Sequence, residues 1–131
     1  MLPRAERLQR RRDFAATYAR KKSWASLLLV LYVRRHPPEG EWGETRRFGF
    51  SVSKKVSKNA VVRNRVKRRL REICRAHGDE WRRGFDAVIV ARAASAHAAY
   101  ADLDAAVCAL IVSRASLAVS VAATTKSVGE T

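Results

Sequence analysis

The sequence predicts an α+β fold, an α/β sandwich in which elements in the order α-β-β-α-β-α surround a small mixed sheet. Apolar residues recur at helical spacing in three segments, and three other segments are short runs that are continuously apolar or alternating. Prolines and glycines separate several of these segments. With 131 residues, 47% of them apolar, the chain is long enough to bury a core as one domain.

The first half of the chain predicts one helix followed by two strands. In residues 13–20, Phe14 and Tyr18 are four positions apart and therefore lie on one helical face. Residues 27–33 are seven apolar residues in a row, a length typical of a strand rather than a helix. Beyond a loop rich in proline and glycine, residues 46–53 alternate bulky and small side chains, so one strand face is nearly bare. The pattern also allows an additional short strand.

A helix over residues 59–75 is the most strongly patterned element. Its apolar residues form one stripe, and Ser57 or Asn59 is placed to cap its first turn. His77 and Gly78 are suited to end it. The stripe consists of Val62, Val66, Leu70 and Ile73.

The last two elements are a strand and a helix. Residues 87–91 form a short apolar run, the pattern of a buried central strand, and residues 99–114 carry apolar side chains at helical spacing. No periodicity follows residue 116. We therefore expect a single domain over residues 1–117 and a flexible tail over residues 118–131.

Composition excludes several classes of protein. The longest apolar run has seven residues, whereas a membrane-spanning helix needs about 20. The two cysteines, Cys74 and Cys108, are too few for the disulfide framework of a small secreted domain. We therefore expect a cytoplasmic protein without a membrane partner.

The positive charge is concentrated in two segments. The chain has 27 Lys and Arg against 12 Asp and Glu, which gives a net charge of +15. Residues 1–24 carry +6 and residues 54–75 carry +9, whereas residues 76–131 carry −1. A surface that served only solubility would intersperse the two signs. This distribution indicates that the partner is a polyanion.

The sequence shows no catalytic constellation. His36, His77 and His97 lie far apart, with no convincing nucleophile or set of carboxylates around them. Cys74 and His77 have a C-x2-H spacing, but a metal site needs two more ligands and the only other cysteine is Cys108. We therefore expect no catalytic residue, no metal site and no tightly bound cofactor on the protein.

Basic side chains occupy the circumference of the predicted helix over residues 59–75 outside its apolar stripe. Burial of the stripe would aim these bases outward and create a rigid surface for phosphates, which arginine contacts bidentately. A merely solvated helix face is the alternative, but ten bases and one acid within residues 54–75 would repel one another without a polyanion. The candidate binding residues are Arg63, Asn64, Arg65, Lys67, Arg68 and Arg71.

Two aromatic residues are candidates for contact with single-stranded RNA, which proteins hold by stacking and positive charge. Phe14 and Tyr18 offer ring faces, and Lys54 and Lys55 end a strand whose bare face a nucleic-acid backbone could approach. Alternatively, the two rings anchor the first helix to the core. The two roles are compatible.

Residues 47–72, RFGFSVSKKVSKNAVVRNRVKRRLRE, resemble the signature of the bacterial ribonuclease P protein component. In that family a strand ending in S-x-S-K-K leads into a helix with the pattern R-N-R-x-K-R-x-x-R. The similarity covers about residues 1–117, because the N-terminal LPRAERLQRRRDF, the strand over 87–91 and the last helix also fit. The matching residues are Ser51, Ser53, Lys54, Lys55, Arg63, Asn64, Arg65, Lys67, Arg68 and Arg71.

The resemblance implies a domain that binds a large catalytic RNA and assists endonucleolytic removal of the 5′ leader from precursor tRNA. The RNA and its magnesium ions would be the catalyst, so the protein alone would not be catalytic, and no obligate protein partner is expected. The resemblance also implies a left-handed βαβ crossover through residues 46–91, against the usual right-handed rule.

The resemblance assigns two RNA-binding sites. The basic helix, residues 63–71, would dock on the catalytic RNA. A cleft between the first helix and the sheet face would bind the leader of precursor tRNA. The leader-binding residues would be Phe14, Tyr18, Tyr32, Ser51, Ser53, Lys54 and Lys55.

Two other functions are compatible with the residues. A ribosomal or other structural RNA-binding protein would use the same basic surface without a role in tRNA processing. A DNA-binding architectural protein would prefer duplex DNA to structured RNA at matched salt. Preference for precursor over mature tRNA, measured together with the catalytic RNA, separates a leader-binding protein from the first rival.

Overall fold

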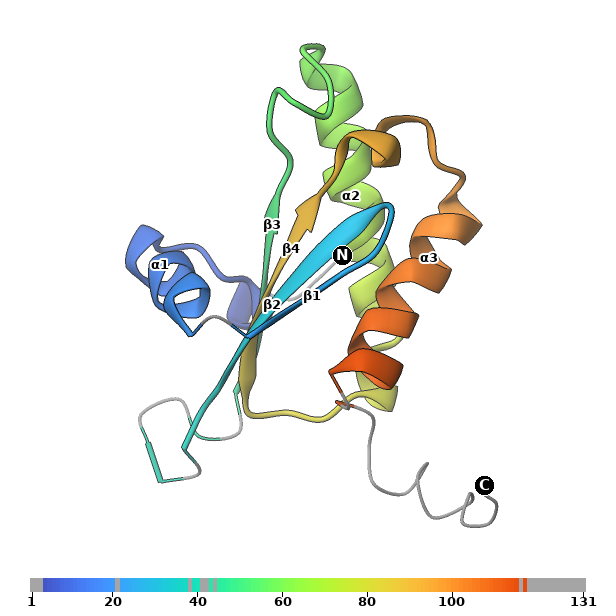
Figure 1. Cartoon of the computed structure of the whole chain (residues 1–131). Coiled ribbons are helices and arrows are strands. Elements are labelled where there is room, and N and C mark those ends of the chain that lie inside the picture. Colours follow the sequence, from blue (N-terminus) through green and yellow to red (C-terminus); the bar gives the residue numbers. More distant parts are fainter. Residues whose placement is uncertain are drawn as a thin grey trace, which may run out of the picture.

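The computed structural model describes residues 4–20, 22–37, 39–40, 43, 45–115 and 117, and shows helices on both sides of a sheet (Figure 1). Short 3-10 turns lie at η1 (Arg4–Glu6), η2 (Gly78–Glu80) and η3 (Ala93–His97), and a π-helical segment, η4 (Ala109–Arg114), extends the last helix. The principal elements are α1 (Arg11–Ala19), β1 (Ser23–Ala25), β2 (Leu29–Arg35), β3 (Arg46–Ser51), α2 (Ala60–Ala76), β4 (Phe85–Ala91) and α3 (Tyr100–Cys108).

The sheet is mixed, which confirms the predicted fold class. Its strand order is β1-β2-β4-β3, with β1 antiparallel to β2, β2 antiparallel to β4, and β3 parallel to β4. Strand β1 is the additional short strand that the pattern allowed. Helix α2 connects the parallel pair, and the left-handed sense of this crossover stays a prediction.

One face of the sheet carries the apolar core. Leu31, Phe48 and Ile89, from three different strands, are buried there together with Leu70 of α2 and Leu103 of α3. Helices α2 and α3 lie on this side of the sheet, and α1 lies on the other side (Figure 1). The longest and most basic helix is therefore anchored by the core.

Helix α2 begins one residue after the predicted start and ends one residue after the predicted end. Asn59 rather than Ser57 caps it, because the Asn59 Oδ1 accepts a hydrogen bond from the Val61 amide at 2.9 Å. Of the predicted stripe, Val66, Leu70 and Ile73 are no more than 1% exposed. The apolar stripe is confirmed as the buried side of α2.

The end of the described chain packs on the domain. The predicted last helix over 99–114 is α3 followed by the π-helical η4, so its backbone hydrogen bonding changes at Ala109. Leu117 is buried, and its carbonyl oxygen accepts a hydrogen bond from the Arg82 amide at 2.6 Å. The predicted tail over residues 118–131 lies outside the described residues.

Helix α1 packs on the second face of the sheet over Gly49. A Cβ at Gly49 would lie 2.5 Å from the Phe14 ring, closer than any side chain tolerates. The ring therefore rests directly on the backbone of β3. The bare strand face that the alternation predicted is the surface that accommodates α1.

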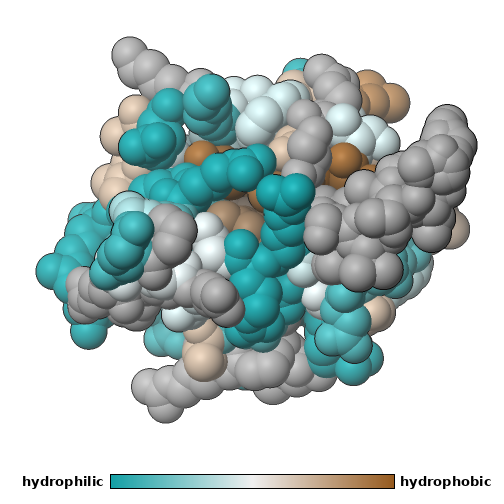
Figure 2. Space-filling model, turned by 90° about the horizontal axis from the view of Figure 1, so that it is seen from below, coloured by the Kyte–Doolittle hydropathy of each residue, from teal (hydrophilic) through white to brown (hydrophobic). Residues whose placement is uncertain are grey.

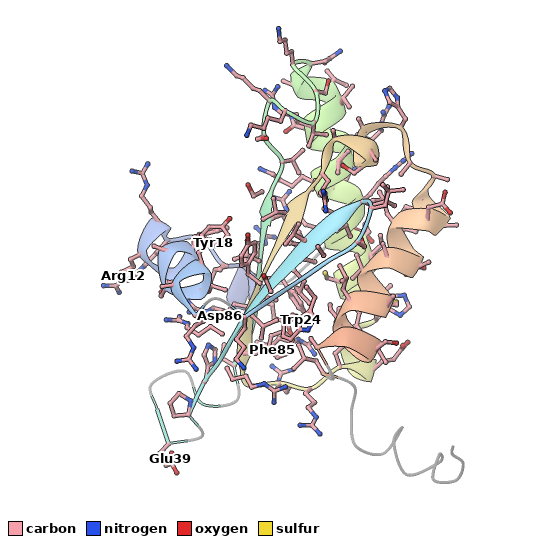
Figure 3. All side chains as sticks on the ribbon, viewed as in Figure 1. Arg12, Tyr18, Trp24, Glu39, Phe85 and Asp86 are labelled. Atoms are coloured by element: carbon pink, nitrogen blue, oxygen red, sulfur yellow. The ribbon has the colours of Figure 1, made fainter. Side chains whose placement is uncertain are left out.

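A buried ion-pair network also joins α1 to the sheet. Asp86 of β4 is fully buried and accepts two hydrogen bonds from Arg47, from Nε at 2.9 Å and from Nη2 at 2.8 Å. Arg34 donates to the same carboxylate at 2.6 Å, and Arg47 also donates to Asp13 of α1 at 3.2 Å. His36 Nε2 lies 3.0 Å from Asp86. The network ties α1 to the three strands beneath it, where Figure 3 shows Asp86.

The arginines determine the ionisation of Asp86. Burial favours the neutral carboxyl, but hydrogen bonds from Arg47 and Arg34 outweigh it and hold the pKa of Asp86 below its ordinary value. Because the pKa is lower in the folded state than in the unfolded state, this group stabilises the fold above the unfolded-state pKa of about 4. The stabilisation is lost as the pH falls through the lower, folded-state pKa.

We expect Asp86→Asn to lower the free energy of unfolding by about 3 kcal/mol or more, because it leaves the buried Arg47 guanidinium without its bidentate partner. Urea denaturation measured between about pH 7 and pH 3 should also show a shallower loss of stability with acid in the variant. Asp102→Asn, in the exposed first turn of α3, is the matched control and should change stability by less than about 1 kcal/mol. Equal stability of the two variants would contradict the role of the network.

Candidate nucleic-acid interface

The predicted binding residues of α2 occupy several sides of its exposed half. Lys67 and Arg71 turn toward β3 and line a groove. Asn64 and Arg68 are exposed along the outer ridge, and Arg65 lies on the flank nearer η3. This division follows from the 100° rotation per helical residue once the apolar stripe is buried. The basic helix therefore presents more than one surface to a partner.

Backbone carbonyls, rather than acids, hold the arginines on the flanks of α2. Within the described ranges, no carboxylate lies within 4.0 Å of the side chains of Arg63, Arg65, Arg68 or Arg71, and the ion pair of Arg75 with Glu72 is at the other end of the helix. The carboxylates of the described residues thus leave the positive charge in the N-terminal half of α2 unneutralised. The carbonyl contacts are Arg63 to Ser57 at 2.9 Å, Arg65 to Ala96 at 3.4 Å and Arg69 to Ala98 at 3.3 Å.

A groove of about 420 Å³ lies between the N-terminal segment, β3 and α2. It combines cationic side chains from two elements with aromatic rings from α1 and β3. The N-terminal segment reaches this position because the Leu8 amide donates to the Phe48 carbonyl at 2.7 Å, along the free edge of β3. The lining residues are Arg7, Leu8, Gln9, Phe14, Phe48, Phe50, Lys67 and Arg71.

Local sequence patterns did not indicate several residues of this groove. Arg7, Gln9 and Phe50 were not among the predicted site residues. The +6 charge of residues 1–24 was a signal for the N-terminal segment, but its docking beside β3 is a long-range contact that no local pattern predicts. The alternation over residues 46–53 placed Phe50 on the bulky face of its strand but indicated no binding role for it.

The structure brings together several of the predicted leader-binding residues on the α1 side of the sheet. The rings of Tyr18 and Tyr32 meet edge to face with centroids 4.8 Å apart, and the Tyr18 hydroxyl lies beside Ser51. Tyr18 is 37% exposed and projects from α1 toward the sheet (Figure 3). Burial raises the pKa of the Tyr18 phenol, so the ring remains neutral at physiological pH. A neutral, oriented and accessible ring suits stacking on a base.

Phe14 fits both of its proposed roles geometrically. It anchors α1 by lying on Gly49, and one part of its ring also lines the groove with Lys67 and Arg71. It therefore connects the α1 side of β3 with the basic helix. Contact with RNA at either surface stays a prediction.

Ser53, Lys54 and Lys55 lie in an exposed turn immediately after β3. The turn is closed by a hydrogen bond from the Val56 amide to the Ser53 carbonyl at 3.0 Å, and Ser53 Oγ accepts from the Lys55 amide at 3.2 Å. These bonds make Ser53 a turn residue and leave both lysine side chains exposed. The two lysines extend positive charge from β3 toward the start of α2.

Basic residues also gather at the other end of the molecule. Figure 2 looks at this end and shows hydrophilic side chains spread across its centre. A pocket of about 240 Å³ there is lined by Arg35, Arg82 and Arg83, among others. The fold thus places two arginines from the nearly neutral C-terminal part of the sequence beside one from β2.

The prediction that the histidines lack carboxylates was wrong for two of them. His36 lies 3.0 Å from Asp86, and His77 lies 2.7 Å from Asp104 and 3.2 Å from Glu80. All of these partners except Glu80 are distant in sequence, so only the fold brings them together.

The fold and the charged surface define a basic α+β protein whose charge suits a polyanionic partner. A family model described as Ribonuclease P matches residues 2–115. The ribonuclease P protein component of Alkaliphilus oremlandii is 37% identical over 101 residues, covering 77% of this chain and 83% of that protein. The corresponding protein of a Cyanothece species is 44% identical over 103 residues, covering 70% and 79%.

The chain belongs to the ribonuclease P protein family. Its members are protein components of a tRNA-processing endoribonuclease that also contains RNA. Solved structures agree: the ribonuclease P protein of Staphylococcus aureus has a TM-score of 0.73 at 27% identity, covering 87% of this chain and 98% of that one. The Thermotoga maritima protein has a TM-score of 0.69 at 27% identity, covering 81% and 94%.

We expect Arg68→Ala to weaken binding to ribonuclease P RNA and to lower the slope of log K against log salt by about 0.7 to 0.9, the value of one phosphate contact. Arg68 is a cleaner probe than Arg65, because Arg65 is half-buried and also bonds to Ala96. Titration at several salt concentrations measures the slope. Arg75→Ala, on the same helix but paired with Glu72, is the matched control and should leave the slope unchanged. Identical slopes for both variants would exclude phosphate contact at Arg68.

Proposed function

We propose that this chain binds the catalytic RNA of ribonuclease P through α2 and holds the 5′ leader of precursor tRNA against the α1 side of its sheet. The observation that carries the proposal is the groove in which Phe14 and Phe50 lie beside Lys67 and Arg71. Aromatic rings next to cations are the combination that binds single-stranded nucleic acid. The two RNAs would therefore meet the protein on adjacent surfaces.

The candidate residues for the catalytic RNA have the chemistry to contact phosphates. Asn64 and Arg68 are exposed on the ridge of α2, and Arg63 is oriented by its bond to Ser57. A helix held by a buried stripe presents these groups without the ordering cost of a flexible basic segment. Arg65, Lys67 and Arg71 complete this candidate surface.

The candidate leader site combines stacking with a low, polar strand surface. Tyr18 and Tyr32 offer rings, Ser51 offers a hydroxyl, and Ser53, Lys54 and Lys55 follow at the end of β3. Phe14 extends the site into the groove. Such contacts tolerate any leader sequence, because every base has a stacking face.

The proposed role of the protein is positioning, and the RNA and its magnesium ions supply the hydrolysis of the phosphodiester. Holding the leader adds binding energy to precursor tRNA that mature tRNA cannot gain. We also propose that the protein acts in the cytoplasm without an obligate protein partner. Free thiols at Cys74 and Cys108 fit a reducing compartment. Within the described ranges, no helix has the length and apolar character needed to cross a membrane.

We expect the holoenzyme, reconstituted with a bacterial ribonuclease P RNA at low magnesium, to bind precursor tRNA more tightly than mature tRNA. Tyr18→Ala should weaken precursor binding by between about 5-fold and 150-fold, the loss of one stacked base, without changing mature tRNA binding. Equilibrium binding and 5′ maturation assays measure both effects.

Tyr18→Phe is the matched control, because it keeps the ring and removes only the hydroxyl that meets Ser51. It should bind precursor tRNA nearly as well as the unaltered protein. Equal affinity of the unaltered holoenzyme for precursor and mature tRNA would reject leader binding and favour a purely structural RNA-binding protein.

A further inference from the structure

Three potential metal ligands converge where the C-terminal end of α2 meets α3. His77 is the C-cap residue of α2, and Asp104 and Cys108 are one turn apart on α3. One ligand atom from each residue lies within 4.8 Å of the other two. His77 Nε2 is 2.7 Å from Asp104 Oδ1, and Cys108 Sγ is 3.5 Å from the same oxygen. Neither helix alone provides the set.

We propose that His77, Asp104 and Cys108 bind a divalent transition-metal ion with the ligand preferences of Zn²⁺, with water as the fourth ligand. The donor set of one imidazole nitrogen, one carboxylate oxygen and one sulfur is one that zinc accepts. Tetrahedral zinc at ordinary bond lengths separates an oxygen and a sulfur ligand by about 3.6 Å. The 3.5 Å between Asp104 Oδ1 and Cys108 Sγ is close to this separation. The 2.7 Å between His77 Nε2 and Asp104 Oδ1 is a hydrogen-bond distance, so the imidazole must move back until the two atoms are about 3.4 Å apart when the ion binds.

A second carboxylate orients the histidine. Glu80 of η2 lies 3.2 Å from His77 Nδ1, the ring nitrogen that faces away from Asp104. In metal sites, a carboxylate that accepts a hydrogen bond from the far ring nitrogen fixes the imidazole and increases its basicity. Glu80 therefore supplies an outer partner typical of a histidine ligand. The four side chains have the connectivity of a carboxylate–histidine–metal arrangement.

The electrostatics of this corner favour a cation. The C-terminal end of a helix carries partial negative charge, and His77 caps the C-terminus of the 17-residue helix α2. Burial, and then the adjacent Asp104 carboxylate, raise the pKa of the Cys108 thiol to about 11. A bound metal ion would reverse that effect, as it does for other coordinating thiols.

Binding of the metal ion would displace one proton from His77 and one from Cys108. Without metal, His77 Nε2 donates a hydrogen bond to Asp104, and Cys108 is a thiol. When the ion binds, the Nε2 proton and the thiol proton both leave to solvent, and their places are taken by the metal. Sulfur and imidazole ligands select zinc-like ions over magnesium. The site would therefore be distinct from the magnesium chemistry proposed for the RNA.

The expected consequence is a link between two helices of the core face. A metal held by α2 and α3 would stabilise the folded chain in proportion to its occupancy. The nearest candidate RNA-binding residue, Arg71, lies six residues before His77, about 9 Å along the helix axis. It lines the groove beside β3, whereas the proposed ligands lie between the end of α2 and α3. Loading of the site should thus change stability without changing the salt dependence of RNA binding.

The test is titration of the full-length, RNA-free protein with Co²⁺ and with Zn²⁺ in a phosphine reductant that leaves thiols free. Co²⁺ should give a thiolate-to-metal charge-transfer band with one ion per chain, and Zn²⁺ in small excess should remove it. A hundredfold excess of Zn²⁺ over its Kd should raise the Tm by about 5 °C or more. Absence of the charge-transfer band in the unaltered protein would overturn the proposal.

Matched variants locate the ligands. Cys108→Ser should abolish the charge-transfer band, whereas Cys74→Ala, at the other cysteine, should retain it. Glu80→Gln should raise the Kd for Zn²⁺ about tenfold or more but keep the band, because Glu80 touches the ring and not the metal. A band that survives Cys108→Ser, or disappears in Cys74→Ala, would overturn the assignment.

A measurement on the unaltered chain guards against variants that fail to fold. Zn²⁺ should slow alkylation of Cys108, identified by peptide mass spectrometry, by about tenfold or more at saturation. An unchanged alkylation rate would overturn the proposal. Because neither RNA nor tRNA is present in these assays, their failure would leave the proposed function in tRNA processing unaffected.

Discussion

The burial of one apolar stripe on α2 is the constraint on which the rest of the interface depends. With Val66, Leu70 and Ile73 fixed in the core, the direction of every other side chain on this helix follows from helical geometry. Lys67 and Arg71 then face the groove beside β3, and Arg68 faces solvent. A basic segment without this anchor would lose affinity to the entropy of becoming ordered on RNA. Packing of the core thus fixes the arrangement of the basic side chains in the unbound protein.

The second face of the sheet is held in a different way. Beneath α1, Asp86 and its two arginines add an ion-pair network to the packing of Phe14 on Gly49, and Asp13 extends the network into that helix. A buried ion pair of this kind contributes little net stability compared with apolar packing, but removing one partner is costly, so it specifies where α1 sits. That position matters because α1 carries Phe14 and Tyr18. The candidate leader site therefore depends on an ion-pair network centred on a fully buried carboxylate.

The two ends of α2 have different chemistry. Its N-terminal half is lined by arginines that the described carboxylates leave unneutralised, whereas its C-terminal end meets His77, Glu80, Asp104 and Cys108. A polyanion is attracted to the first and a cation to the second. One rigid helix can therefore bind RNA and, by the proposal above, a metal ion without competition between the two.

Local patterns determined a large part of this protein. Three local patterns predicted the elements, the fold class and the family: the helical period of residues 59–75, the alternation over residues 46–53 and the signature from Ser51 to Arg71. These patterns could be recognised because each one consists of residues that are close in sequence. Tertiary structure alone decided the docking of Arg7 and Gln9 beside β3, the pairing of Asp86 with Arg47 and Arg34, and the meeting of His77 with Cys108. These contacts join residues far apart in the chain, and a periodicity carries no information about which distant element will lie against it. The helix that Asn59 caps could be predicted from the sequence. The surfaces beside this helix form only because the sheet brings segments that are distant in sequence against it.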